Sequence, residues 1–431
     1  MIKFIRHIIN RSALYISNRY FRKPRTPLQT VDIILDSDDI IDCSNKSIAG
    51  LLMQERLKKL SDKDRNKTCT TISSQYTSMD SFDFDVKFNC FIDFFSKETV
   101  EACIQNQNSK SEVSRTKLKN IQKAFQQVVM IINIKDYEAP ESTCGDLTLT
   151  YQIASQKKSL CTSQNKFALF NEQCIDGAIG SGSFLTQDII ISSLHIFKKG
   201  LFCKNSQSPD PNFFKHIRFV IWENNKIEFK NEKCHIPSDL VYKPKIHIKD
   251  KKETVEVEFP KTFYKKDIEP YFDWIAIKTE RSNCIPNNQT LPIEKPLKAY
   301  ESGSLFTIGH PWGTKPYLNI RGKTIMDSTK RENIFYKTYL GSLNGSSGSP
   351  VYFLSDSPDK PLTHVGILST IQQQDEGAND VGDDIQLSKT NHCCYVLDIH
   401  THQSTTFQHN IANTFTPVTK CETEMIIKKL K

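Results

Sequence analysis

A serine, a histidine and an aspartate occur in this chain in contexts that suit nucleophilic catalysis. Ser347 lies between glycines in the stretch Gly345–Pro350, and Val351, Tyr352 and Phe353 follow as an apolar segment. Glycine permits tight turns and positive φ, so this stretch can present a serine hydroxyl together with its own amide. That arrangement suits a nucleophile beside an oxyanion hole. The same residues also fit an ordinary hairpin loop, so the hypothesis needs a base and an orienting carboxylate.

His195 is the candidate base. It lies near the end of the run GSGSFLTQDIIISSLHIF, in which we expect a Gly-rich turn, a strand, a short turn and a second strand before the histidine. This order places the imidazole at the rim of a sheet. Histidine side chains in general titrate near neutral pH, so they can take a serine proton and return it to a leaving group. A single histidine is more often structural, and the catalytic interpretation depends on its neighbours.

Asp273 is the candidate carboxylate that orients this base. It stands directly before the apolar strand of FDWIAIK and among aromatic residues, where a solvated charge is unexpected. A buried aspartate at that position can bind an imidazole and hold one tautomer. Asp267 and Glu269 are weaker candidates, because they occur in a polar loop without a following strand.

These segments resemble, in the same order along the chain, the motifs of trypsin/chymotrypsin-fold serine proteases, and in particular of the HtrA-type branch. The resemblance covers residues 180–370 and rests on GSGSFLTQDIIISSLHIF, FDWIAIK, LFTIGHPWG, NGSSGSPVY and HVGILST. It implies two six-stranded β-barrels with a triad of His195, Asp273 and Ser347 between them. The segment after Thr405 is too short for the PDZ-like domain that full HtrA enzymes carry.

The resemblance also implies an oxyanion hole and a substrate pocket. The oxyanion donors would be the backbone amides of Gly345 and Ser347. Gly341 stands where members that cleave after basic residues carry an aspartate, and Thr370 and Ile371 follow Ser369 on the cleft strand. We therefore expect an uncharged P1 pocket of modest size and poor cleavage after lysine or arginine.

Two departures from the secreted members of this family concern activation and redox state. Ser346 replaces an aspartate that pairs with a newly cut N-terminus, so activation by propeptide cleavage is not expected. Ile196 follows the histidine in place of a cysteine. The chain has 13 cysteines but no CxxC pair, so we favour reduced thiols and an intracellular protein, in the cytoplasm or the nucleus.

The elements that must position these residues are mostly short strands. The density of strand-like segments between residues 126 and 405 predicts an all-β unit, either a barrel or a sandwich. The family resemblance specifies a double β-barrel. Expected strands are 128–134, 147–153, 184–193, 214–222, 226–229, 254–259, 274–278, 304–308, 335–340, 351–353, 364–370 and 394–397.

The segments before and after this strand-rich unit are expected to lie outside the protease-like domain. Residues 29–125 form an N-terminal extension of irregular α/β pattern and unassigned function, with a strand at 31–35, strands within 82–95 and helices at 48–60 and 111–128. Residues 406–431 form a tail that ends in a helix. Residues 1–28 carry seven basic and no acidic residues, which fits a mitochondrial transit peptide, a surface-binding helix or a disordered tail.

Composition narrows the functional classes. The net charge of +8 is diffuse and gives no nucleic-acid signature, and no apolar run is long enough to span a membrane. We expect neither a metal nor a cofactor, and we interpret His310 as a turn residue and His392, Cys393 and Cys394 as strand packing. The leading hypothesis is a serine endopeptidase acting on proteins or peptides. The alternatives are an inactive protease-fold binding or regulatory protein, and a chromatin- or membrane-docked factor acting through the basic N-terminus.

Overall fold

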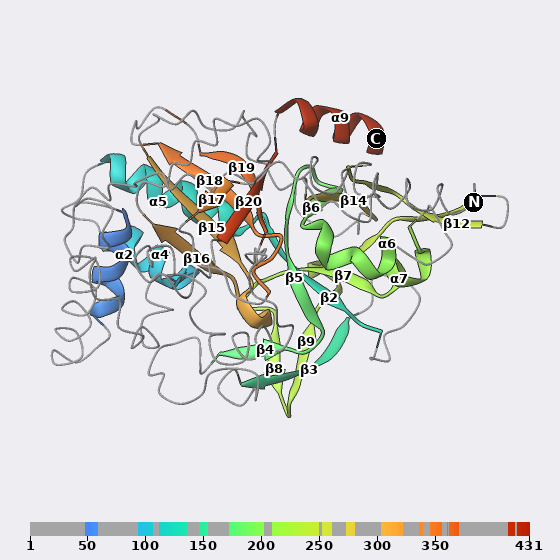
Figure 1. Ribbon diagram of the computed structural model, residues 1–431. Helices are drawn as coiled ribbons and strands as arrows, with labels where there is room; N and C mark the ends of the chain where they lie inside the picture. The colour runs from blue at the N-terminus through green and yellow to red at the C-terminus, as the bar shows by residue number, and fades with distance from the viewer. Residues whose placement is uncertain are drawn as a thin grey trace, which may run out of the picture. The chain divides into compact units, whose positions relative to one another are not determined.

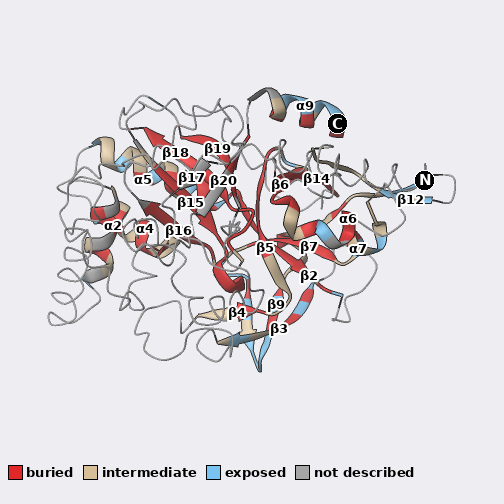
Figure 2. Cartoon of the chain, in the orientation of Figure 1, coloured by how far each residue is buried: buried red, intermediate tan, exposed pale blue. Residues whose placement is uncertain are grey.

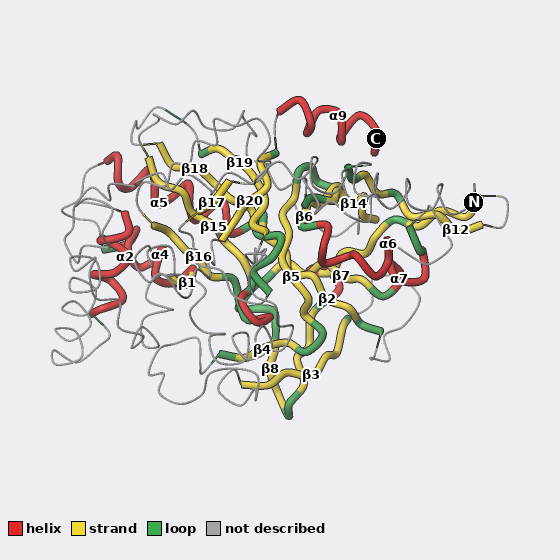
Figure 3. The backbone as a smooth tube through the Cα atoms, in the orientation of Figure 1, coloured by secondary structure: helices red, strands yellow, loops and turns green. Residues whose placement is uncertain are grey.

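A computed structural model describes the elements that carry these motifs (Figure 1). The residues it describes are 48–58, 94–106, 112–135, 146–153, 172–201, 209–249, 252–260, 273–280, 303–321, 336–338, 345–355, 360, 362–369, 413–418 and 420–431. Strands dominate these residues (Figure 3), and the expected all-β class is confirmed. Among them no helix is long and apolar enough to cross a membrane.

The first sheet closes on itself as a six-stranded antiparallel barrel. Its order is β10-β7-β2-β5-β6-β14, and β14 pairs back to β10 through Lys243 and Glu280. The short strand β13 (Val257–Glu258) adds to β14 outside this ring. The barrel strands are β2 (Val128–Asn133), β5 (Ala178–Phe184), β6 (Ile189–Ser192), β7 (Ile217–Ile221), β10 (Val241–Pro244) and β14 (Ile275–Glu280).

Strand β2 contributes to the cores of both sheets, and its sequence is a run of apolar, mostly β-branched residues. Val129, Ile131 and Ile132 are fully buried in the barrel core, whereas Val128 belongs to the core of the second sheet. Both faces of the strand are therefore covered, so its sequence is continuously apolar instead of alternating. Figure 2 shows buried residues concentrated along the strands of both sheets.

The second sheet has seven antiparallel strands, in the order β1-β16-β15-β18-β19-β20-β17. Its members are β1 (Phe94–Ser96), β15 (Gly303–Gly309), β16 (Tyr317–Arg321), β17 (Tyr336–Thr338), β18 (Pro350–Ser355), β19 (Thr363–Ser369) and β20 (Asn413–Pro417). Two of these strands come from the expected flanks, because β1 precedes residue 126 and β20 follows residue 405. Segments far apart in the sequence therefore complete one sheet.

Three helices of the N-terminal extension pack on this second sheet: α2 (Ile48–Leu57), α4 (Lys97–Gln105) and α5 (Glu112–Phe125). Helix α5 is amphipathic, and its Leu118 and Ile121 are fully buried at the spacing of one helical face. They share a core cluster with Phe306 of β15 and Tyr352 of β18. The apolar face of the extension is thus covered by the sheet that carries the candidate nucleophile.

The remaining elements are short. A four-stranded sheet runs β4-β3-β9-β8, and β11 pairs with β12 in a hairpin. Helix α9 (Lys420–Leu430) packs Ile426 and Leu430 against Trp274. Their bounds are β3 (Leu147–Ile153), β4 (Gln173–Ile175), β8 (Glu228–Lys230), β9 (Lys233–Ile236), β11 (Ile246–Lys249), β12 (Lys252–Val255), η5 (Leu194–Phe197), α6 (Lys198–Leu201), α7 (Pro211–Lys215), η6 (Ser238–Leu240) and η8 (Pro311–Gly313).

Three local expectations were wrong. The strand expected at 184–193 is interrupted, because residues 185–188 form bends between β5 and β6. Gly180–Ser183 is not a turn but part of β5, where it pairs with both β2 and β6. The strand expected at 214–222 begins only at Ile217, because Asp210 caps a helix whose first residue is Pro211. The strands expected at 31–35 and 394–397 lie outside the described residues.

Candidate active site

His195 lies in the turn η5, directly after β6. Leu194 and Phe197, three residues apart in a 3₁₀ turn, are both fully buried in the first barrel. These two anchors leave the His195 side chain at the barrel edge, with 34% of it exposed. The turn is therefore anchored by two buried side chains, while its imidazole stays accessible.

Asp273 meets His195 through both of its carboxylate oxygens. Its Oδ2 lies 2.6 Å from Nδ1 of the ring, and its Oδ1 accepts the His195 backbone N–H at 2.9 Å. The register of the sheet brings the two residues near each other: Ile275 of β14 pairs with Ser192 of β6, and Asp273 lies two residues before Ile275 while His195 lies three residues after Ser192. A carboxylate oxygen is a hydrogen-bond acceptor, so this geometry favours the tautomer in which Nδ1 carries the proton and Nε2 is left for proton exchange.

Asp273 is fully buried. Its backbone N–H donates to the Thr416 hydroxyl at 3.3 Å. Thr416 belongs to β20, so a strand of the second sheet binds the backbone of Asp273, two residues before β14 begins in the first. The hydrogen bonds to the His195 ring, the His195 backbone and the Thr416 hydroxyl together fix Asp273 relative to the ring.

Ser347 lies in the turn between Gly345 and Gly348, which have φ of 91° and 85°. Those left-handed conformations favour glycine, because a Cβ would clash with the backbone there. The turn is bound to β5 of the first barrel through Ser181. The Ser181 N–H donates to the Ser347 carbonyl at 2.8 Å, and its hydroxyl donates to the Gly345 carbonyl at 2.7 Å.

The carbonyl of Leu368 joins the serine turn to the histidine segment. It accepts the Gly348 N–H at 2.8 Å and the Ser193 hydroxyl at 3.0 Å. A Cβ placed on Gly348 would lie 3.1 Å from the Ser193 nitrogen. The residue after Ser347 is therefore packed against the residue two positions before His195. The turn that carries Ser347 therefore adjoins the segment that leads into His195.

The other predicted site residues are only partly described. Gly345 and Ser347, the expected oxyanion donors, belong to one turn. Ser369 is the last residue of β19 and pairs with Thr414 of β20. Gly341, Thr370 and Ile371, which were expected to line the substrate pocket, lie outside the described residues.

His310 is a buried turn residue, as expected from its sequence context. Its Nδ1 lies 2.9 Å from the Thr314 carbonyl, and its side chain is fully buried. Burial lowers the pKa of His310 to about 4, although the bond to Thr314 raises it. This imidazole is therefore neutral near pH 7.

Sequence reasoning missed Ser181 and Thr416. The glycines around Ser181 indicated a turn, yet they allow close backbone packing: a Cβ on Gly180 would lie 2.4 Å from Ile196 Cδ1 and 3.2 Å from the Ser347 carbonyl oxygen. Thr416 lies beyond the expected end of the strand-rich unit. Of these two residues, only Ser181 has a distinctive sequence context, because it stands between two glycines.

No family model matches the chain, and no curated protein sequence matches it. Among the described residues no group of His, Cys, Asp and Glu is arranged to hold a metal ion. The likenesses found are to solved structures, and the three described below are distant in sequence.

Three such structures are peptidases. A Glu endopeptidase in complex with MPD aligns over 60% of this chain and 86% of its own, at 12% identity and a TM-score of 0.32. Deg5 aligns over 61% and 88%, at 14% identity and a TM-score of 0.31. A catalytically inactive tobacco etch virus protease with substrate aligns over 71% and 85%, at 12% identity and a TM-score of 0.30. The fold assignment accordingly depends on the strand pairing of this chain itself, one closed barrel beside a second antiparallel sheet.

Proposed function

We propose that this protein is a serine endopeptidase that cleaves protein or peptide substrates through His195, Asp273 and Ser347. The observation that carries the proposal is the two-point contact between Asp273 and His195 beside the Ser347 turn. A structural histidine at a barrel edge does not require a fully buried carboxylate on Nδ1. A general base gains from one, because the carboxylate orients the ring and stabilises the imidazolium.

In this mechanism the Ser347 hydroxyl attacks the scissile carbonyl carbon, and Nε2 of His195 takes the hydroxyl proton. The amides of Gly345 and Ser347 donate to the resulting oxyanion. The C–N bond then breaks as Nε2 returns its proton to the leaving amine. Water, deprotonated by the same nitrogen, attacks the acyl-enzyme, and the serine recovers its proton as the new carboxyl group leaves.

The nucleophile turn in this proposal needs no newly formed N-terminus. Ser346 is buried and uncharged, and its carbonyl accepts the Ser349 N–H at 3.0 Å within the turn. Contacts from Ser181 hold the same turn from the first barrel. We therefore propose an enzyme that is competent without propeptide cleavage, formed by residues 126–405 together with the strands that flank them.

For the substrate we propose an uncharged P1 side chain, since Gly341 offers no acidic group at the position that the family resemblance assigns to the pocket floor. A peptide library incubated with the protein should yield few cleavages after lysine or arginine. A profile dominated by those two residues contradicts this part of the proposal.

A fluorophosphonate probe tests the function itself, because it reacts far faster with an activated serine than with an ordinary hydroxyl group. We expect it to label the protein, and we expect Ser347→Ala to abolish the label. Ser114→Ala, on helix α5, is the matched control and should label normally. Unlabelled but well-folded protein would instead favour the alternative, a protease-fold binding or regulatory protein.

A further inference from the structure

A turn that precedes β16 packs directly against the expected oxyanion glycine. This segment, His310–Lys315, is called the 310–315 turn below. A Cβ placed on Gly345 would lie 2.5 Å from the His310 carbonyl oxygen and 2.9 Å from the Trp312 nitrogen. The position of the Gly345 peptide therefore depends on the position of the 310–315 turn.

The 310–315 turn is strained, so it needs support from outside. Trp312 has φ of 55°, a left-handed conformation that costs free energy for a bulky side chain. Internal bonds contribute: the Thr314 hydroxyl donates to the Pro311 carbonyl at 2.7 Å, and the Gly313 N–H donates to the His310 carbonyl at 3.0 Å. Such a conformation persists only where the surrounding structure imposes it.

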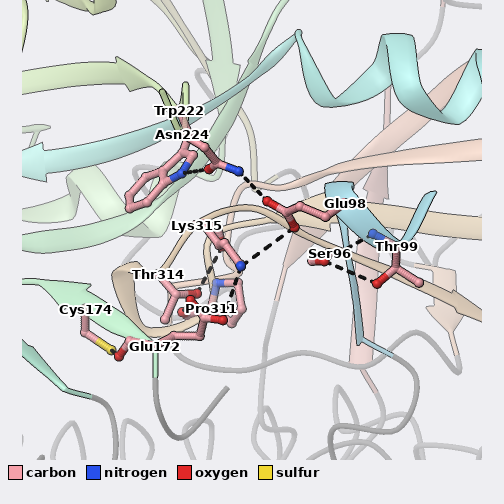
Figure 4. A network of polar contacts seen from close by, with 10 residues as sticks. All are labelled: Ser96, Glu98, Thr99, Glu172, Cys174, Trp222, Asn224, Pro311, Thr314 and Lys315. Atoms are coloured by element: carbon pink, nitrogen blue, oxygen red, sulfur yellow. Dashed lines mark hydrogen bonds and ion pairs between the residues drawn. The ribbon is translucent and has the colours of Figure 1, made fainter. Parts of the chain in front are cut away.

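Glu98 of the N-terminal extension reaches this turn by two routes, and Figure 4 shows its contacts with Lys315 and Asn224. Its Oε2 forms an ion pair with Lys315 Nζ at 3.7 Å, and Lys315 also pairs with Glu172 at 3.2 Å. Its Oε1 accepts a hydrogen bond from the Asn224 amide. Asn224 accepts the Trp222 indole N–H at 2.6 Å, and the Trp222 ring lies beside the His310 ring, with 6.2 Å between centroids.

The position of Glu98 is itself fixed. It lies in the first turn of α4, whose N-cap Ser96 is the last residue of β1, and β1 pairs with β16 through Ser96 and Tyr317. Burial raises the pKa of Glu98, but hydrogen bonds from Ser96 and Asn224 and the charge of Lys315 outweigh burial and lower it. The carboxylate is therefore ionised near pH 7, as the pair with Lys315 requires.

We propose that Glu98 is a positioning residue for the turn that carries Gly345 and Ser347. The N-terminal extension then sets the reactivity of Ser347 through the 310–315 turn. This inference rests on the proposed serine protease function. It implies that a ligand or modification that displaces α4 would weaken catalysis without touching the triad.

Saturation kinetics of fluorophosphonate labelling test this inference, since they separate the first-order rate constant of reaction, kinact, from the affinity constant KI. We expect Glu98→Ala to lower kinact about tenfold and to leave KI unchanged, because misplacement of an oxyanion donor affects the reaction step and not ground-state binding. Glu98→Gln, which keeps an acceptor for Asn224, should lie between Glu98→Ala and the wild type. Glu101→Ala, on the same helix, is the matched control and should retain the wild-type kinact.

Lys315→Met removes the other partner of the same ion pair, on the side of the 310–315 turn. It serves as the test if Glu98→Ala does not fold. We expect the same fall in kinact, with Lys243→Met as its control. Wild-type kinact in the folded Glu98 and Lys315 variants would overturn the inference while the protease function stands. A change in KI alone would overturn it in the same way. No labelling of the wild type would instead reject the protease function, and this inference with it.

Discussion

At the scale of single residues, the contact between Asp273 and His195 is the feature most specific to catalysis. Asp273 is fully buried, and its two oxygens bind a ring nitrogen and a backbone amide of the same histidine. A carboxylate in that position fixes both the ring plane and the tautomer. Burial without such partners would be costly, so the surroundings of Asp273 are organised around the imidazole.

We predict that Asp273→Asn lowers the rate of fluorophosphonate labelling about 10³- to 10⁴-fold while the protein stays folded. The amide cannot stabilise the imidazolium and can hold the ring in the wrong tautomer. Asp239→Asn is the matched control, since Asp239 forms a surface pair with Lys226 at 2.8 Å. Equal labelling rates in both variants would show that Asp273 has no part in activating the serine.

The candidate residues stood out in the sequence because each stands beside a strong local pattern, such as the glycines around Ser347. Ser181 could not be placed in the site from sequence, although its hydroxyl and amide bind the carbonyls of Gly345 and Ser347. Its Gly-Ser-Gly context predicts a turn locally. Pairing with two neighbouring strands, which only the tertiary fold supplies, makes it part of β5 instead.

At the scale of elements, the N-terminal extension contributes to the core of the second sheet. Strand β1 pairs with β16, and helices α4 and α5 bury Val100, Leu118 and Ile121 against that sheet. The amphipathic period of α5 was readable from sequence. The three-residue strand β1 overlaps only the end of the strands expected within 82–95, and its pairing with β16 could not be predicted, because so short a strand is defined by its partner.

We predict that Ile121→Ala destabilises the whole protein by about 2–5 kcal/mol, the usual cost of a cavity at a fully buried isoleucine. A thermal melt should show a single transition at lower temperature, because the helix and the sheet share one core. Lys119→Ala, at an exposed position of the same helix, should leave the transition in place. A separate early transition for the extension would contradict this view of its packing.

At the scale of the whole molecule, buried histidines should make stability depend on pH. His310 and His364 are both buried, and burial lowers each pKa to about 4. In the unfolded chain an ordinary histidine titrates near 6.5, so between pH 6.5 and about 4 the unfolded state binds more protons. Stability therefore falls as the pH falls through this window.

We predict that each of these histidines accounts for roughly 3 kcal/mol of the loss between pH 7 and pH 4. Urea unfolding of His364→Gln at both pH values should show a smaller difference than the wild type. His235→Gln removes an exposed histidine and should leave the difference unchanged. An unaltered pH dependence in His364→Gln would mean that this side chain is not held neutral.

The identity of the modified residue tests the central claim most directly. After reaction with a fluorophosphonate, mass spectrometry of the digested protein should place one phosphonyl adduct on Ser347, and Asp273→Asn should greatly slow its formation. That result would establish an activated serine served by the His195–Asp273 pair. An adduct on another residue, or no adduct on folded protein, would contradict the assignment of Ser347 as the nucleophile.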